Sequence, residues 1–195
     1  MKIQIHIAGS KRSGKTSLGR KLRKSLAEYG FIPAIFDIDD VRRELFGKED
    51  AKASIGSEAN RRFHAAAYEH IFVVLIPKAL TTGRLPITIA THANRTYYDR
   101  ACAIADFYGA KLGFFLLEVP SFHEVIRRAA VDTESLSDTK DLLGNPAEKE
   151  AYLASTSMFE TSYRGKPGKY VWIRQEDKEI MARNALAHLA DIVNA

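Results

Sequence analysis

The residues near the N-terminus whose types and spacing could do chemistry form a glycine-rich stretch. Residues 9–16 read G-x-x-x-x-G-K-T, between an apolar run typical of a strand and an apolar pattern typical of a helix. The two glycines let the backbone turn tightly, so that successive N–H groups can face one anion, and the following helix adds its positive dipole end. We therefore expect a loop that binds the phosphates of a nucleoside triphosphate, made of Gly9, Ser10, Lys11, Arg12, Ser13, Gly14, Lys15, Thr16 and Ser17.

Two side chains of this loop suit further steps of phosphate chemistry. Lys15 can bridge the terminal phosphates as a positive charge. The hydroxyl of Thr16 can bind Mg²⁺, which prefers oxygen ligands. The pattern thus implies a nucleotide together with its magnesium ion.

A second group of charged residues follows the next apolar run. The sequence FDIDDVRRELFG at 36–47 holds three aspartates and two arginines. In open α/β sheets ligands bind outside the carboxyl ends of strands, so these carboxylates should face the glycine-rich loop. A carboxylate such as Asp39 can orient a hydroxyl and take its proton, and Arg42, one helical turn later, can neutralise a negative group of the acceptor. Asp39 could also cap the short helix that follows, and the two roles are compatible.

The elements that must position these residues alternate along the chain. Apolar runs predict five strands, at 2–8, 32–36, 85–90, 111–119 and 170–173. Helical periodicity predicts helices at 15–29, 57–80 and 95–108, another beginning at 121, and a last one at 177–194. The alternation indicates an α/β fold with a five-stranded parallel sheet covered on both faces, in one domain spanning 1–195. The helix at 57–80 should bury a stripe formed by Phe63, Ala66, Ala67, His70, Ile71, Val74 and Leu75.

The polar segment 132–149 is the least core-like part of the chain. It is rich in Asp, Ser, Thr and Glu, and it contains the sequence Gly-Asn-Pro at 144–146. In a nucleotide-binding fold such a segment is a candidate lid that closes over the phosphates and excludes water. A solvated loop is the alternative.

Composition and charge limit the classes of partner. The net charge of +5 suits polyanionic ligands, and nucleotides are sufficient to explain it, while nucleic acid is possible but not favoured. No apolar run is long enough to cross a bilayer, and no signal-peptide pattern begins the chain, so we expect a cytoplasmic protein without a membrane partner. The single cysteine, Cys102, cannot form a disulfide within the chain. The oligomeric state does not follow from the sequence.

Taken together, the two charged groups resemble a known family. GSKRSGKT followed by FDIDDVRRELFG looks like the small P-loop kinases related to adenylylsulfate kinases, zeta-toxin kinases, phage-type polynucleotide 5′-kinases and the kinases described as AAA-family ATPases. The resemblance covers most of the chain and includes the sequence THANR at 91–95. It implies a P-loop NTPase three-layer sandwich with a lid, and an ATP- and Mg²⁺-dependent phosphotransferase acting on an alcohol group. The two motifs are not specific for the acceptor.

The resemblance also implies roles for individual residues. Asp39 matches the acid that activates the acceptor, Arg42 matches the arginine that binds it, and Asp37 lies where some relatives hold an acid near the water shell of magnesium. The catalytic residues would be Lys15, Asp39, Arg127 and Arg128, the last two as lid arginines that grip the nucleotide. Arg95 and Arg100 follow the third strand, where relatives carry arginines near the acceptor.

One position departs from the family pattern. Relatives usually end the third strand with an aspartate that orders the waters of magnesium, and this chain has Ala90 there. Asp37 is the candidate to replace that carboxylate. His92, two residues later, could bond to acceptor or phosphate, although a polar loop residue is the commoner role for a lone histidine.

Three functions remain open from the sequence. The leading one is an ATP-dependent kinase that transfers the γ-phosphoryl group to a hydroxyl of a small molecule. The second is a kinase acting on the 5′-hydroxyl of a polynucleotide, and the third is an ATP-binding regulatory protein with weak or no transferase activity, which Ala90 would favour. No Asn-Lys-x-Asp motif of the guanine-reading type occurs, so ATP is favoured over GTP.

Overall fold

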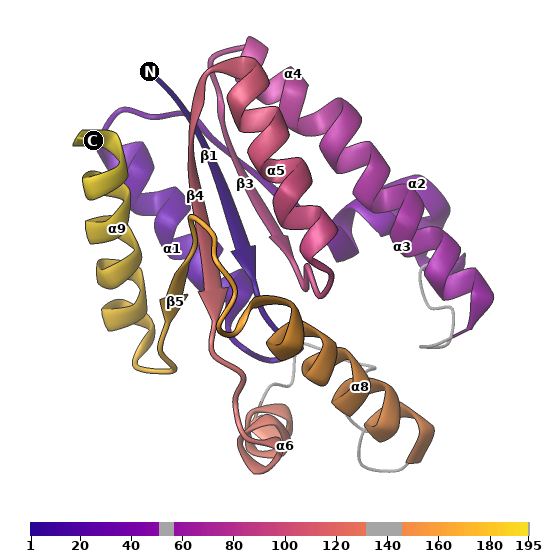
Figure 1. The fold of residues 1–195 in the computed structure, drawn as a ribbon. Helices are drawn as coiled ribbons and strands as arrows, with labels where there is room; N and C mark the ends of the chain where they lie inside the picture. The colour runs from indigo at the N-terminus through magenta and orange to yellow at the C-terminus, as the bar shows by residue number, and fades with distance from the viewer. Residues whose placement is uncertain (51–56, 132–145, 195) are drawn as a thin grey trace.

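The computed structural model describes residues 1–50, 57–131 and 146–194, and its centre is a parallel sheet (Figure 1). The strands lie in the order β2-β3-β1-β4-β5, and every pair is parallel. Their bounds are Lys2–Ala8 (β1), Pro33–Asp37 (β2), Leu85–Ala90 (β3), Ala110–Leu117 (β4) and Val171–Ile173 (β5). The predicted α/β class with a five-stranded parallel sheet is therefore confirmed, each strand within two residues of its expected bounds.

Helices connect and cover these strands. They are Lys15–Glu28 (α1), Ile38–Asp50 (α2, interrupted at Gly47), Glu58–His70 (α3), Ile76–Thr81 (α4), Arg95–Tyr108 (α5), Phe122–Val131 (α6), Pro146–Tyr163 (α8) and Lys178–Asn194 (α9). Among the described residues, no helix combines the length and apolarity that a membrane crossing requires. Residues 132–145 of the predicted lid lie outside the described residues, and 146–149 form the first turn of α8.

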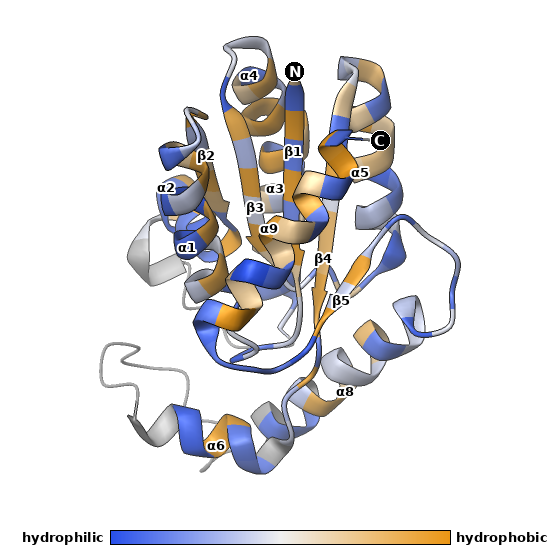
Figure 2. Cartoon of the chain, turned by 90° about the vertical axis from the view of Figure 1, so that its left-hand side faces the viewer, coloured by the Kyte–Doolittle hydropathy of each residue, from blue (hydrophilic) through white to orange (hydrophobic). Residues whose placement is uncertain are grey.

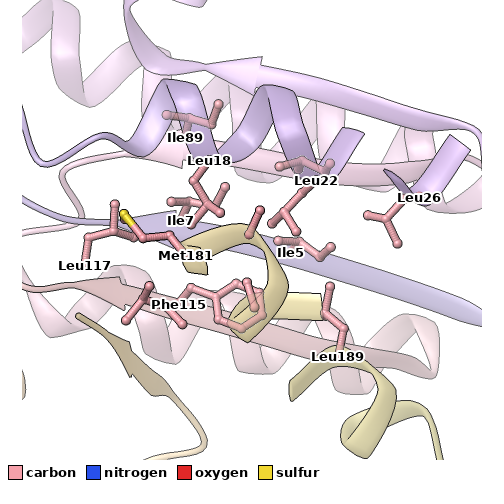
Figure 3. Packing of buried hydrophobic residues seen from close by; sticks show 14 of the residues in the cluster. Ile5, Ile7, Leu18, Leu22, Leu26, Ile89, Phe115, Leu117, Met181 and Leu189 are labelled. Atoms are coloured by element: carbon pink, nitrogen blue, oxygen red, sulfur yellow. The ribbon is translucent and has the colours of Figure 1, made fainter. Parts of the chain in front are cut away.

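Two apolar clusters hold the helices on the two faces of the sheet. Helices α1 and α9 cover one face, and Figure 3 shows their side chains packed against β1, β3 and β4; the members include Ile5, Ile7, Leu18, Leu22, Ile89, Phe115, Met181 and Leu189. Helices α3, α4 and α5 cover the other face, and the C-terminal part of α8 adds to the same cluster, whose residues include Tyr68, Phe72, Ile76, Tyr98, Ala101, Phe159 and Tyr163. The central strands β1 and β3 and the second half of β4 are buried along almost their whole length, and Figure 2 shows hydrophobic residues along much of β3 and β4.

A glycine sets how closely α1 approaches the sheet. A Cβ atom at Gly19 would lie 2.4 Å from Cδ1 of Ile89 and 3.4 Å from Cδ1 of Ile7. The helix can therefore pack directly on β1 and β3 only because this position has no side chain. Since α1 begins at Lys15, this contact also sets the position of the glycine-rich loop.

The long helical segment before β3 contains a widened turn. Between α3 and α4, residues Ile71–Leu75 form a π-helical turn (η1), in which the N–H of Ile76 bonds to the carbonyl of Ile71. Pro77 explains it, because proline has no N–H and its ring clashes with the carbonyl four residues earlier in an α-helix.

This turn changes which residues face the core. Ile76 is fully buried, whereas Val74 is 43% exposed and Ala66 is also exposed. The predicted stripe is therefore wrong at Val74, because the extra residue in the turn rotates the second half of the helix. It is also wrong at Ala66, which precedes the turn, because the buried side of α3 there is formed by Ala67 and Tyr68. The sequence signal for this rotation was Pro77, and the prediction, which assumed regular helical spacing throughout, did not take it into account.

Helix α8 was not predicted. Its apolar side consists of widely spaced aromatic residues, Tyr152, Phe159 and Tyr163, so its periodicity is weak. With α6, it lies beyond the carboxyl ends of the strands in Figure 1. The loops that leave these strand ends carry most of the candidate functional residues.

Candidate functional site

The glycine-rich loop joins β1 to α1 in a conformation suited to anion binding. Arg12 and Gly14 have left-handed backbone conformations, with φ of 63° and 90°. The Ser13 N–H donates to the carbonyl of Ser10 at 3.3 Å, and the Gly9 N–H donates to the carbonyl of Thr91, at the end of β3, at 3.3 Å. A Cβ at Gly9 would lie 2.6 Å from Oγ of Ser13 and 3.1 Å from Cβ of Leu117, so a side chain there would force these neighbours to move. The predicted strand–loop–helix context is present.

Lys15 projects back across this loop. Its Nζ donates to the carbonyl of Ser10 at 2.6 Å. Burial lowers the pKa of Lys15 to about 8, and the negative charges of Asp39 and Asp37 oppose this lowering. The ammonium group is therefore still charged at neutral pH, and it lies within electrostatic range of both carboxylates.

Thr16 and Asp37, the two residues predicted to bind magnesium, are in direct contact. Oγ1 of Thr16 donates to Oδ2 of Asp37 at 3.1 Å, and the backbone N–H of Asp39 donates to Oδ1 of Asp37 at 3.1 Å. Burial, and then the nearby Asp39, raises the pKa of Asp37. A cation would relieve both effects, and a hydroxyl with a carboxylate is the donor type that Mg²⁺ prefers. The chemistry of these two side chains fits a magnesium ion.

Arg42, with Asp39 beside it, contacts a histidine of α3, His64, that the sequence did not suggest. Arg42 is only 6% exposed, although arginine is rarely buried. Its Nη1 lies 2.9 Å from Nε2 of His64 and 3.9 Å from Oδ1 of Asp39. Burial, followed by the charge of Arg42, lowers the pKa of His64 to about 4. The imidazole is therefore neutral, and its Nε2 accepts the hydrogen bond from Arg42.

Only the fold could have revealed His64. It lies 22 residues after Arg42, on another helix, and no motif connects the two. Nearby, the rings of Phe46 on α2 and Phe63 on α3 pack with centroids 4.6 Å apart. Helices α2 and α3 thus place a buried positive charge beside an aromatic pair and an exposed carboxylate, Asp39.

The two predicted lid arginines lie in different surroundings. Nη1 of Arg128 donates to the carbonyl of Arg12 in the loop at 3.0 Å and to Oε1 of Gln175 at 2.9 Å. Arg127 is more exposed and pairs with Glu124, which also accepts from Arg128 at 2.7 Å. The structure therefore brings Arg128, but not Arg127, into contact with the phosphate-binding loop.

Arg95 and Arg100 are engaged elsewhere in the fold. Arg95 donates to the carbonyl of Pro167, and its guanidinium lies 5.2 Å from the ring centroid of Tyr98. Arg100 forms a two-bonded ion pair with Glu69 on α3. These contacts tie α5 to the loop before β5 and to α3, and the predicted acceptor role of both arginines stays a prediction.

His92 is fully buried, which corrects its expected place as a polar loop residue. Its φ is 47°, an unusual value for a residue other than glycine. Two tyrosines hold its backbone: the His92 N–H donates to Oη of Tyr68 at 3.1 Å, and Oη of Tyr163 donates to its carbonyl at 2.9 Å. Ala90 before it is buried beside Ala8 of β1 in the apolar cluster. The sheet therefore offers Asp37, from β2, as the nearby carboxylate.

Comparisons with known proteins identify the fold. No protein-family model matches the sequence, and a search of the curated proteins found no match. Among solved structures, the chain is similar to a gluconokinase from Sinorhizobium meliloti, with a TM-score of 0.62 and 19% identity over 97% of this chain and 93% of that chain. It is similar to the APS kinase of Mycobacterium tuberculosis in complex with AMPPNP and APS, with a TM-score of 0.65 and 18% identity over 100% and 98% of the chains. A shikimate kinase from Bacteroides thetaiotaomicron has a TM-score of 0.58 and 15% identity over 99% of both chains. The chain has the fold of the small P-loop kinases, as its motifs predicted.

Proposed function

We propose that this protein is an ATP-dependent phosphotransferase that transfers the γ-phosphoryl group of ATP to a hydroxyl of a small molecule. The observation that carries the proposal is the hydrogen bond between Thr16 and Asp37. It joins the phosphate-binding loop to the segment that holds Asp39 and Arg42, so that nucleotide and acceptor residues share one edge of the sheet. The similarity in fold to kinases of gluconate, APS and shikimate supports the same reading.

In this proposal the loop amides and Lys15 bind the β- and γ-phosphates. Thr16 and Asp37 would hold Mg²⁺, which neutralises charge on the phosphate oxygens when it is bound. Arg128 is already in contact with the loop and can stabilise the charge that develops on the transferring group. Arg127 and the pair Arg95 and Arg100 are not needed for this assignment.

The acceptor would bind between α2 and α3. Asp39 is exposed, with its backbone fixed on Asp37, and its carboxylate can take the proton of the acceptor hydroxyl as that oxygen bonds to phosphorus. The γ-phosphoryl group leaves ADP in the same step, so that one phosphoryl group and one proton are transferred. The buried guanidinium of Arg42 would bind a negative or strongly polar group of the acceptor.

A second function, an ATP-binding regulator with little transferase activity, has one observation in its favour. Ala90 is buried in an apolar cluster where the family pattern has an acid. If Asp37 does not replace that acid, magnesium binding and transfer would be weak.

Transfer of label from γ-labelled ATP tests these functions. The wild-type protein would be incubated with a fractionated small-molecule extract and, in parallel, with 5′-hydroxyl RNA and DNA. The matched variant D39N should keep its affinity for ATP and lose about 10²–10⁴-fold in transfer, the usual effect of removing a general base. Label on an oligonucleotide would make the protein a polynucleotide kinase. Bound ATP without any transfer would favour the regulator, and equal transfer by D39N would reduce Asp39 to a structural residue.

A further inference from the structure

Gln175 lies at the junction of three chain segments around the phosphate-binding loop. It is in the loop between β5 and α9. Its Nε2 donates to the carbonyl of Ser13 at 3.0 Å and to the carbonyl of Glu118, just after β4, at 2.6 Å. Its Oε1 accepts from Nη1 of Arg128 at 2.9 Å. The amide group therefore uses both its donor and its acceptor on partners 47 to 162 residues away in sequence.

These bonds act on the peptide groups that a phosphate would meet. In a trans peptide the C=O and the next N–H point in opposite directions. Because Gln175 holds the Ser13 carbonyl, the N–H of Gly14 points away from Gln175. Arg128 holds the preceding carbonyl, that of Arg12, at 3.0 Å. Two successive carbonyls are thus bound from one side, in the stretch where Arg12 and Gly14 have left-handed φ values.

We propose that Gln175 is a positioning residue of the nucleotide site. It keeps the Ser13–Gly14 peptide turned so that the Gly14 N–H faces phosphate, and it holds Arg128 against the loop. A loop fixed in its binding conformation loses less conformational freedom when the ligand binds, so the affinity is higher. The role rests on the proposed function, since it assumes that the loop binds the phosphates of ATP.

Calorimetric titration of the full chain with Mg²⁺ and the non-hydrolysable analogue AMPPNP tests this role. We expect Q175L, which removes all three bonds, to raise the Kd by about tenfold or more, the effect expected for the loss of one to two hydrogen bonds that shape a site. Q175E keeps an acceptor for Arg128 but has no donor for the two carbonyls, and it should weaken binding as much. E176Q, at an exposed position of the same loop, is the matched control and should bind like the wild type.

A second measurement separates positioning from a general loss of structure. In protein labelled with ¹⁵N-glycine, the Gly14 amide signal should differ between wild type and Q175L before ligand is added, while the signal of Gly113, inside β4, stays in place. A purely structural role would move both signals or neither. Because the signals are compared in the free protein, this measurement does not depend on determining the affinity of a destabilised variant.

The outcomes distinguish the two proposals. If the wild type binds AMPPNP and Q175L binds it with the same Kd, the role of Gln175 is overturned and the proposed function stands. Wild-type affinity in Q175E, with weak binding in Q175L, would assign the effect to Arg128 alone and overturn the peptide-orienting role. No binding by the wild type would overturn the proposed function and this role with it.

Discussion

Acid should destabilise this protein through a histidine in the middle of its sheet. His6 of β1 is fully buried, with its ring stacked at 5.7 Å from Phe72 and 5.4 Å from Phe114. Its Nε2 lies 2.6 Å from the amide nitrogen of Gln4, which fixes it as an acceptor. Burial lowers the pKa of His6 from 6.5 to about 3. The folded protein thus keeps this ring neutral over a range in which the unfolded chain protonates it.

The sign and size of the effect follow from this difference. Unfolding takes up a proton below pH 6.5, so the stabilisation from His6 is complete above that pH and is lost as the pH falls towards 3. At 1.36 kcal/mol per pH unit, the loss between pH 8 and pH 5 is about 2 kcal/mol. At pH 3, where the folded form is itself half protonated, the loss is about 4 kcal/mol, close to the whole stability of a small domain.

The variant H6F isolates this contribution. A phenyl ring fits between the same two aromatic neighbours and does not titrate, whereas every other titrating group remains. Urea unfolding at pH 8, 7, 6 and 5 should show that H6F loses about 2 kcal/mol less than the wild type across the series. The constant cost of leaving Gln4 without its acceptor cancels, because only the slopes are compared. H123Q, at an exposed histidine of α6, should follow the wild type, and parallel profiles for wild type and H6F would refute the reasoning.

Three further predictions concern the site. The affinity for AMPPNP should fall as the pH rises above about 8, because binding needs the charged form of Lys15. Calorimetry from pH 7 to 9.5 should show this fall in the wild type and not in K15R. An affinity of the wild type that does not change with pH would contradict the prediction. D37N should raise the Mg²⁺ concentration for half-maximal phosphotransfer by about tenfold or more, and an unchanged requirement would end its assignment as the replacement for Ala90. H64L should raise the KM of the phosphoryl acceptor more than that of ATP, because it removes the nitrogen that accepts the hydrogen bond from Arg42. H64Q offers an oxygen in place of this nitrogen and should retain most of the activity. Equal KM values in the wild type, H64L and H64Q would separate His64 from the site of the phosphoryl acceptor.

The sheet was predictable because its strands read as short apolar runs, and its central strands are buried on both faces. The glycine-rich loop was predictable because its geometry depends on the backbone of eight consecutive residues, which stand together in one stretch of the sequence. The contact of Thr16 with Asp37 also follows from a general rule, since the carboxyl ends of parallel strands meet at one edge.

The contacts between distant segments were not predictable. His64 and Gln175 act on residues 22 and 162 positions away, and nothing in their own neighbourhoods marks them. Arg95 and Arg100 carry the same charge as Arg128, but only the packing of α5 against its neighbours determines that they face Pro167 and Glu69. The spacing of residues along a helix predicts which side of the helix they lie on, but it does not predict which residues of other segments they contact.

The widened turn η1 makes the length of its segment unusually important. A π-turn holds one residue more than an α-turn, so a deletion in 71–75 would remove the residue that the widened turn takes up, while Pro77 would still lack the N–H of a regular helix. The contacts of His64 with Arg42 and of Tyr68 with the backbone of His92 both come from α3, so both depend on the orientation that this turn gives α3 relative to α4. Surface loops can gain and lose residues with little effect, whereas a residue gained or lost in 71–75 would change the orientation of the helix that carries both of these contacts.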